Sequence, residues 1–297
     1  MTRTLRLATR SSPLALWQAR WVSRLLRQAH PGLRVQLVPL SSSGDQDRST
    51  GLYQSTSVGV FVREIQAAVL DGRADAGVHS CKDLPTTEPE GLTLVATPPR
   101  ADVRDALITA DGRTLDEIPE GAVIGTSSLR RQTQLAARRP DLRFVPIRGN
   151  VDTRIAKMQR GEVQATLLAM AGLHRLGLVV SSKAVALDPW RTCIPAPAQG
   201  AVAIDCRTGD ARTQRLLAAI SDLATWRAIH LEREILRRCE GGCSLPLGVL
   251  ATRHPDGTWN LRAALGDAHL PLQVVTCEGG DPAGFSDRVL RAFGRAT

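Results

Sequence analysis

Residues 122–128 read Ala-Val-Ile-Gly-Thr-Ser-Ser, an apolar run followed at once by a small polar turn. Residues 5–12 follow the same plan, Leu-Arg-Leu-Ala-Thr-Arg-Ser-Ser. A helix pattern begins after each turn, and in the first case Pro13 suits the first helical position with Ser12 as its N-cap. The chain therefore contains a strand–turn–helix unit twice.

The correspondence continues beyond these units. Residues 139–142 (Arg-Pro-Asp-Leu) match residues 30–33 (His-Pro-Gly-Leu), where the first helix is expected to stop. Further on, residues 65–78 and 155–168 each contain a helix pattern, a turn with glycine and a small-residue apolar strand. Two similar α/β lobes follow from this repeat. In the second lobe, Leu129, Thr133 and Ala136 recur on one face of the expected helix.

Proline-rich segments at residues 97–100 and 194–197 indicate two crossings between the lobes. The apolar run 201–204 is expected to return to the first lobe as a strand. Two crossings make a cleft that can hinge. A helical stretch over residues 211–238, three strand-like runs and a final helix over 282–293 predict a small third α+β domain.

The predicted fold is thus α/β, with two hinged lobes and a small C-terminal α+β domain. We expect lobe 1 over residues 1–99 and 200–218, lobe 2 over residues 100–199, and the C-terminal domain over residues 219–297.

Composition narrows the class of ligand. The net charge is +9, and of the 38 basic residues three are lysine, so 35 are arginine. Arginine grips carboxylates and phosphates bidentately. Acidic residues are interspersed among the basic ones and aromatics make up only 3% of the chain, which disfavours nucleic acid and favours an acidic small molecule.

Signals for other locations and for metals are weak. The N-terminus has no signal-peptide apolar region, and no stretch approaches the roughly 20 apolar residues of a membrane span, so we expect a cytoplasmic protein with no membrane partner. The six cysteines show no zinc spacing, so no metal site is expected.

One carboxylate stands where a predicted strand stops. Residues 74–78 form a small-residue apolar run, and residues 79–83, which include Ser80, Lys82 and Asp83, follow it directly. His79 has no partner at metal-ligand spacing, so we interpret it as a structural residue. α/β proteins place their chemistry at the carboxyl ends of strands. Asp83 is therefore either a working acid or the partner of Lys82 in an ordinary ion pair.

The polar turn of the second lobe is a candidate anion site. Ser127 and Ser128 offer hydroxyl donors at a helix N-terminus, and Arg130 and Arg131 add charge within its first turn. Cations there oppose the helix dipole, so they need a compensating anion. The alternative is a solvated arginine face. Cys243 follows two glycines, and it is either an accessible thiol or a buried structural residue.

Several motifs in order make the chain resemble the porphobilinogen deaminase family almost from end to end. They are ATRxSPLALWQA at 8–19, VHSxKD at 78–83, GTSSLRRQ at 125–132, RGNVxTR at 148–154, AGLxRLG at 171–177, QGAV at 199–202 and EGGC at 240–243.

The resemblance implies a specific activity. It implies lobes like periplasmic binding proteins and a transferase that joins four porphobilinogen molecules into the linear tetrapyrrole hydroxymethylbilane, with release of ammonia, in heme biosynthesis. Asp83 would be the catalytic carboxylate. Cys243 would carry a dipyrromethane cofactor through a thioether, and the protein would be a monomer with porphobilinogen as its small-molecule partner.

The resemblance also distributes the binding roles. Residues implied for the cofactor, besides Cys243, are Ser80, Lys82, Thr126, Ser127, Ser128, Arg130, Arg131, Arg148 and Arg154. Those implied for substrate are Arg10, Ser12, Arg175 and Gln199.

One loop departs from the family pattern, because Gln54 and Val58 replace its usual lysines. We expect an active enzyme that holds carboxylates less tightly from this side. The competing hypotheses are a cofactor-less relative, a two-lobe binding protein or effector sensor without catalysis, and a nucleic-acid binder driven by the positive charge.

Overall fold

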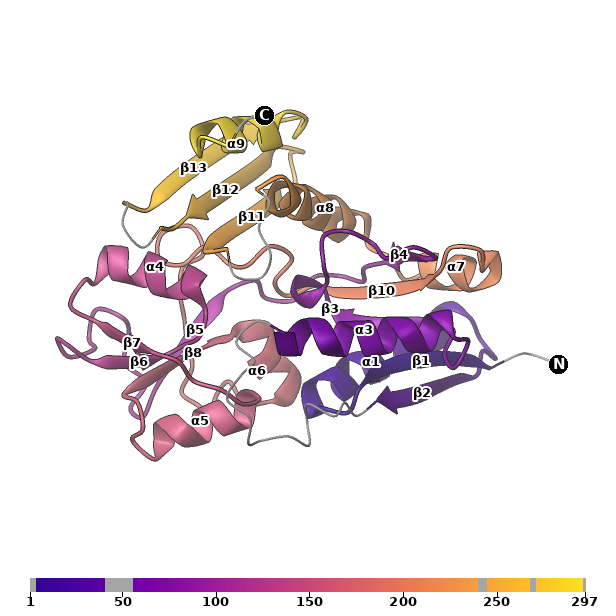
Figure 1. The fold of residues 1–297 in the computed structure, drawn as a ribbon, viewed down its shortest axis with the longest axis horizontal. Coiled ribbons are helices and arrows are strands. Elements are labelled where there is room, and N and C mark those ends of the chain that lie inside the picture. Colours follow the sequence, from indigo (N-terminus) through magenta and orange to yellow (C-terminus); the bar gives the residue numbers. More distant parts are fainter. Residues whose placement is uncertain (1–3, 41–55, 240–244, 268–270, 296–297) are drawn as a thin grey trace. The chain divides into compact units, whose positions relative to one another are not determined.

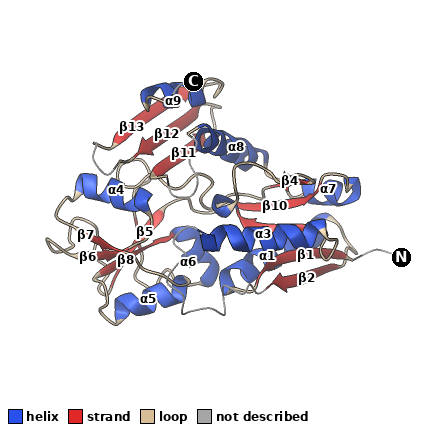
Figure 2. Cartoon of the chain, in the orientation of Figure 1, coloured by secondary structure: helices blue, strands red, loops and turns tan. Residues whose placement is uncertain are grey.

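The computed structural model describes residues 4–40, 56–239, 245–267 and 271–295, without the side chains of residues 56–61 (Figures 1 and 2). The chain forms two compact units. One comprises residues 1–100 and 201–227, and the other comprises residues 101–200 and 228–297.

The first unit is built on a five-stranded sheet with the order β2-β1-β3-β10-β4. Its strands are β1 (Leu5–Arg10), β2 (Val35–Leu40), β3 (Ala76–Ser80), β4 (Leu92–Ala96) and β10 (Val202–Arg207). β2, β1 and β3 are parallel, whereas β10 runs antiparallel between β3 and β4, with Val202 opposite Ser80. The expected return of residues 201–204 to the first lobe is therefore confirmed.

Helices cover both faces of this sheet. α1 (Pro13–Ala29) and α7 (Ala211–Ala218) contribute to the core on one face, and α3 (Thr56–Leu70) packs on the other. The Ser12 hydroxyl accepts the N–H of Ala15 at 3.4 Å, which confirms Ser12 as the N-cap of α1. α3 begins four residues before the predicted start near residue 60.

The second unit contains a sheet of the same plan, β7-β6-β8-β5-β9. Its strands are β5 (Asp105–Thr109), β6 (Val123–Gly125), β7 (Arg143–Val145), β8 (Ala165–Ala169) and β9 (Val185–Ala186). β7, β6 and β8 are parallel, and β5 runs antiparallel beside β8. α4 (Leu129–Arg138) packs on one face, while α5 (Val151–Gln159) and α6 (Met170–Leu176) pack on the other.

The repeat read from the sequence is confirmed in backbone detail. His30 ends α1 at φ −133° and ψ 84°, and Arg139 ends α4 at φ −132° and ψ 79°. Each donates its N–H to the carbonyl four residues earlier, on Leu26 and Leu135 respectively. Two distant segments of different sequence therefore stop their helices in the same way.

The buried face of α4 is mostly polar. The face that carries Leu129, Thr133 and Ala136 is not the buried one, and Leu129 is 48% exposed. The buried residues of α4 are instead Arg130, Arg131, Gln134 and Leu135. Apolar spacing does not mark this buried face, because the helix buries polar side chains that have partners elsewhere in the second unit.

The C-terminal part of the second unit is a three-stranded antiparallel sheet, β11 (Leu247–Arg253), β12 (Trp259–Leu265) and β13 (Gln273–Gly279). α8 (Leu223–Arg238) and α9 (Phe285–Ala292) share its larger apolar core. The helical stretch predicted over residues 211–238 is two helices, α7 and α8. The predicted fold class, two α/β lobes and a small α+β domain, is confirmed.

Candidate functional site

The predicted chemistry of the first unit lies at one edge of its sheet. Because β2, β1 and β3 are parallel, their carboxyl ends meet at this edge, where β1 ends with Arg10 and β3 ends with Ser80. A short 3₁₀ turn, η1 (Cys81–Asp83), follows β3 without a break. Its first N–H is tied to the carbonyl of Ala201 at 3.0 Å, so Lys82 and Asp83 stand on a held turn, both half-buried.

Polar side chains brace the strand that leads to Asp83. Gln18 of α1 donates to the Ser80 hydroxyl at 2.9 Å. One residue earlier, the buried His79 ring meets Asp205 at 3.1 Å, and Gln66 of α3 donates to the other oxygen of Asp205 at 3.2 Å. The sequence interpretation of His79 as a structural residue fits this arrangement.

In the second unit, three hydroxyls shape the turn before α4. Thr126 accepts the N–H of Ser128 at 3.2 Å, and Ser127 donates to the carbonyl of Ile147 at 3.1 Å. The Ser128 side chain caps α4 by accepting the N–H of Arg131 at 3.4 Å. These predicted cofactor ligands therefore also hold the turn in its shape.

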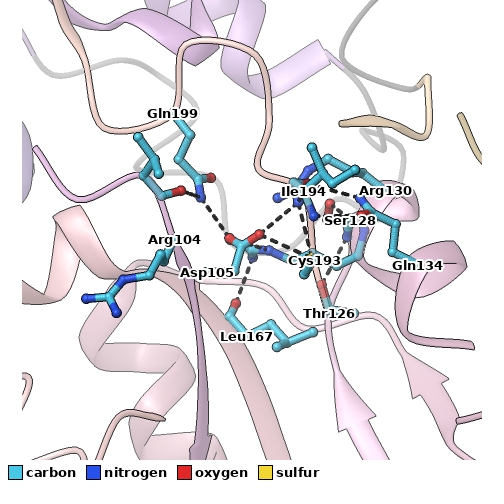
Figure 3. A network of polar contacts seen from close by, with 12 residues as sticks. Arg104, Asp105, Thr126, Ser128, Arg130, Gln134, Leu167, Cys193, Ile194 and Gln199 are labelled. Atoms are coloured by element: carbon cyan, nitrogen blue, oxygen red, sulfur yellow. Dashed lines mark hydrogen bonds and ion pairs between the residues drawn. The ribbon is translucent and has the colours of Figure 1, made fainter. Parts of the chain in front are cut away.

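The predicted arginines Arg130 and Arg131 both bind Asp105, a residue that the sequence analysis did not identify. Asp105, the first residue of β5, is fully buried and lies opposite Ala169, the last residue of β8 (Figure 3). Its Oδ2 accepts Nη1 of Arg130 at 2.7 Å, and its Oδ1 accepts Nη2 of Arg131 at 2.6 Å and Nε at 3.1 Å. Asp105 is the compensating anion that the two arginines required.

Electrostatics keep this group ionised. Burial alone would raise the pKa of Asp105, but the charges and hydrogen bonds of Arg130 and Arg131 outweigh burial and hold the pKa well below its usual range. Burial likewise disfavours the charged form of Arg130, yet Asp105 raises its pKa. Two guanidinium groups and one carboxylate leave a buried net charge of +1. Since the arginines are only 5% and 6% exposed, they form no solvated face.

Two further side chains complete the surroundings of Asp105. Gln199 donates from Nε2 to Oδ1 of Asp105 at 2.9 Å and to the carbonyl of Val103 at 2.9 Å. The Cys193 thiol lies 3.4 Å from Oδ2. Burial and the nearby charge of Asp105 raise the pKa of this thiol to about 12, so it remains neutral.

The segment that carries Gln199 is held along its length. Gln134 of α4 both donates to and accepts from the backbone of Ile194, at 3.0 and 2.7 Å. Arg175 of α6 donates to the carbonyl of Gly200 at 2.7 Å. Burial lowers the pKa of Arg175 to about 10, which still leaves it a cation at neutral pH.

We call Asp105, Arg130, Arg131, Cys193 and Gln199 the Asp105 cluster. Of the remaining predicted arginines, Arg154 lies near this cluster and Arg148 is exposed. Arg154 is half-buried and donates from Nε to the carbonyl of Gly149 at 2.8 Å. Burial lowers the pKa of Arg154, and the charge of Arg131 lowers it further, because the two cations repel one another. Repulsion of this kind favours an anion between them.

The structure thus brings the predicted residues together in two sets. Arg10, Ser12, Ser80, Lys82 and Asp83 belong to the first unit, and the second set, from Thr126 to Gln199, belongs to the second. The predicted attachment residue Cys243 and the loop residue Gln54 lie outside the described residues, and Val58 stands in the first turn of α3 with its side chain undescribed.

A signal for Asp105 was present in the sequence. It is an acidic residue placed directly before the apolar run Ala106-Leu107-Ile108. This order indicates a buried strand whose first residue is a carboxylate. The unbalanced charge of Arg130 and Arg131 called for such a partner. No comparable signal marked Gln134, whose two bonds depend on a segment 60 residues away.

Within the described part of the chain, none of the helices combines the length and apolar character needed to cross a membrane. The same residues contain no group of three or more His, Cys, Asp or Glu side chains placed to hold a metal ion.

Two solved structures that match this chain are distant from it in sequence. One is the VFT2 domain of Bordetella pertussis BvgS in a doubly substituted form, with 14% identity over 78% of this chain and 92% of that chain and a TM-score of 0.44. Another is a Salmonella typhimurium periplasmic binding protein with high arginine specificity, with 12% identity over 78% and 97% of the two chains and a TM-score of 0.44.

Family comparison is far more direct. Residues 5–215 match the porphobilinogen deaminase, dipyromethane cofactor binding domain, and residues 226–279 match the porphobilinogen deaminase C-terminal domain. Together the two matches span most of the chain, so the protein belongs to the porphobilinogen deaminase family.

Proposed function

We propose that the protein is a hydroxymethylbilane synthase. It joins four porphobilinogen molecules head to tail, releases ammonia at each addition and frees a linear tetrapyrrole by hydrolysis. The observation that carries the proposal is the buried net charge of +1 at Asp105, Arg130 and Arg131, within the stretch that matches a dipyromethane-binding domain. The enzyme works as a cytoplasmic monomer on a small-molecule substrate.

The donor set fits the proposed cofactor. Each pyrrole of a dipyrromethane carries an acetate and a propionate, and such carboxylates require cationic and hydroxyl donors. Arg130, Arg131 and Arg154 supply charge on the second lobe, and the turn at Thr126 to Ser128 supplies hydroxyls. When bound through Cys243, the cofactor supplies the pyrrole chain to which substrate units are added.

The position of Asp83 supports its proposed role as the catalytic carboxylate. It follows the carboxyl end of β3 on a turn fixed by the Cys81 N–H, and Gln18 and His79 brace the strand behind it. Loss of ammonia from porphobilinogen leaves a cation on the former aminomethyl carbon. A carboxylate facing the pyrrole N–H stabilises that cation.

Proton balance gives Asp83 a second task. The leaving amine departs as ammonia after gaining a proton, and the new carbon–carbon bond forms as the attacked pyrrole carbon loses one. A single carboxylate within reach of both positions holds and returns this proton, which is general acid–base catalysis. Lys82, next along the turn, serves the carboxylates of cofactor or substrate.

The domain roles follow from the same proposal. Lobe 1, residues 1–99 and 200–218, carries Asp83, and lobe 2, residues 100–199, carries the carboxylate-binding arginines. The C-terminal domain, residues 219–297, carries Cys243, the proposed attachment residue of the cofactor. Arg10, Ser12, Arg175 and Gln199 serve the incoming substrate.

Intact-mass spectrometry tests this function. Protein made in a porphyrin-competent host should be heavier than its sequence mass by one dipyrromethane, with the added mass on the peptide that contains Cys243. It should also release ammonia from porphobilinogen and form a linear tetrapyrrole. An unmodified Cys243 together with no ammonia release would favour a binding protein without catalysis.

A further inference from the structure

We propose that Asp105 is the positioning residue of the cofactor site: it fixes Arg130 so that the Nε–Nη2 edge of this guanidinium faces a carboxylate of the bound dipyrromethane. The inference rests on the proposed function, since it names the residue that orients the cofactor-binding arginines. Asp105 itself touches neither cofactor nor substrate.

The bonds of Arg130 are unevenly distributed over its three nitrogens. Nη1 donates to Oδ2 of Asp105 and to the carbonyl of Ile194, both at 2.7 Å, and lies 3.4 Å from the Cys193 sulfur. Nε and Nη2 meet no acceptor within the described part of the chain, and neither is sealed from solvent there. These two atoms form the edge with which arginine grips a carboxylate bidentately.

Arg131 is bound differently, and Asp105 causes the difference. Its Nε and Nη2 both donate to Oδ1 of Asp105, and its Nη1 donates to the carbonyl of Leu167 at 2.8 Å. The edge that Arg130 leaves open is the edge that Arg131 uses on Asp105. One carboxylate therefore orients the two neighbouring guanidinium groups in different ways.

Other contacts keep Asp105 in one position. Gln199 donates to Oδ1, and the strand register places Asp105 opposite Ala169. The backbone around Gln199 is constrained, because Ala198 takes φ +61° and a Cβ on Gly200 would lie 2.6 Å from the carbonyl oxygen of Ala101. Non-glycine residues rarely adopt such a φ unless the surroundings enforce it.

Charge alone does not explain this arrangement. A carboxylate placed elsewhere near the arginines would reduce their repulsion equally well, but it would not reserve the Nε–Nη2 edge of Arg130. A displacement of about 1 Å in a binding group costs up to about a hundredfold in function. We therefore expect cofactor loading to depend on where the carboxylate sits as well as on its charge.

The test compares Asp105→Asn and Asp105→Glu with the parent protein and with Asp102→Asn. Asp102 is a matched control, since it pairs with Arg104 at 2.6 Å only three residues earlier. The readout is the share of folded, monodisperse protein that carries covalent dipyrromethane, measured by intact-mass spectrometry. Melting temperature, measured on unloaded protein, reports the structural effect of each change.

Both Asp105 variants should show a loaded share at least about tenfold below the parent, whereas Asp102→Asn should load normally. If Asp105→Asn fails to fold, Asp105→Glu decides, because it keeps the charge and moves the carboxylate by one methylene. Normal loading of Asp105→Glu would overturn the inference. A parent protein without dipyrromethane would overturn the proposed function, and the inference with it.

Discussion

The side chain of Glu232 and the backbone N–H of Ala198 lie 2.6 Å apart, and this contact joins helix α8 to the segment that carries Gln199. The second oxygen of Glu232 accepts the N–H of Ala251, on β11, at 2.8 Å. Glu232 is fully buried. One carboxylate thus ties the C-terminal sheet to the strained backbone next to the Asp105 cluster.

Replacement of Glu232 by glutamine should destabilise the second unit. Glutamine has one acceptor oxygen where glutamate has two, so its NH₂ group would face a backbone N–H. A buried polar group without a partner costs about 1–3 kcal/mol. Urea unfolding should show the loss. Glu234→Gln is the control, since Glu234 pairs with Arg238 at 3.5 Å on the exposed side of α8, and an equal loss there would contradict the prediction.

Asp105 should make the protein sensitive to acid in a defined direction. Its pKa in the folded protein lies well below the unfolded value of about 3.9, because Arg130 and Arg131 outweigh its burial. Its stabilisation is therefore present above that unfolded pKa and is lost as pH falls toward the folded pKa. Each pH unit below about 3.9 should cost up to about 1.4 kcal/mol of unfolding free energy.

Urea midpoints at pH 5 and pH 3 measure this effect. The parent protein should lose more stability between the two values than Asp105→Asn does, since the variant has no carboxylate to protonate at that position. Asp71→Asn, at an exposed ion pair with Arg73, controls for loss of a surface carboxylate. It should lose as much stability between pH 5 and pH 3 as the parent protein does. An equal loss of stability between pH 5 and pH 3 in the parent and in Asp105→Asn would contradict the role of Asp105 in this acid sensitivity.

The repeat could be predicted from the sequence because the features that define it are local. Apolar spacing, the Ser12 cap and the shared helix ends at His30 and Arg139 all lie within a few residues of the features they determine. The pairing of the short strands β5 and β9 was not predicted, because Ala106 pairs with Ala186, which is far away in the chain. No local pattern encodes such a partner.

The site residues also fall into those that local motifs could predict and those that depend on long-range contacts. Family motifs pointed to Arg130, Arg131 and Gln199, and the helix dipole argument showed that the arginines needed an anion. The sequence did not say that the anion is Asp105, 25 residues before Arg130, because the contact depends on the register of β5 against β8. The same long-range contact explains why the buried face of α4 is polar.

The altered loop offers a gain-of-affinity test. Gln54 and Val58 stand where the family pattern has lysines, so restoring both as Gln54→Lys and Val58→Lys should add cations toward substrate or cofactor carboxylates. We expect a lower KM for porphobilinogen with little change in kcat, because the added cations would bind the ground state and the transition state equally well. Gln36→Lys adds one positive charge at an exposed position of β2 and should leave KM unchanged. An unaltered KM in the double variant would show that the loop does not meet these carboxylates.

Asp83→Asn is the most direct test of the chemistry. The asparagine side chain has nearly the shape of aspartate, so the turn from Cys81 to Asp83, held by the carbonyl of Ala201, should keep its form. It carries no charge to stabilise the substrate cation and takes up no proton, and loss of general acid–base catalysis costs about 10²–10⁴ in rate. Ammonia release from porphobilinogen should fall by at least that factor, while circular dichroism and the loaded share stay at parent values. Since loading and turnover are separate measurements, a variant that loads fully and still releases ammonia at the parent rate would remove Asp83 from the mechanism and leave the cofactor site intact.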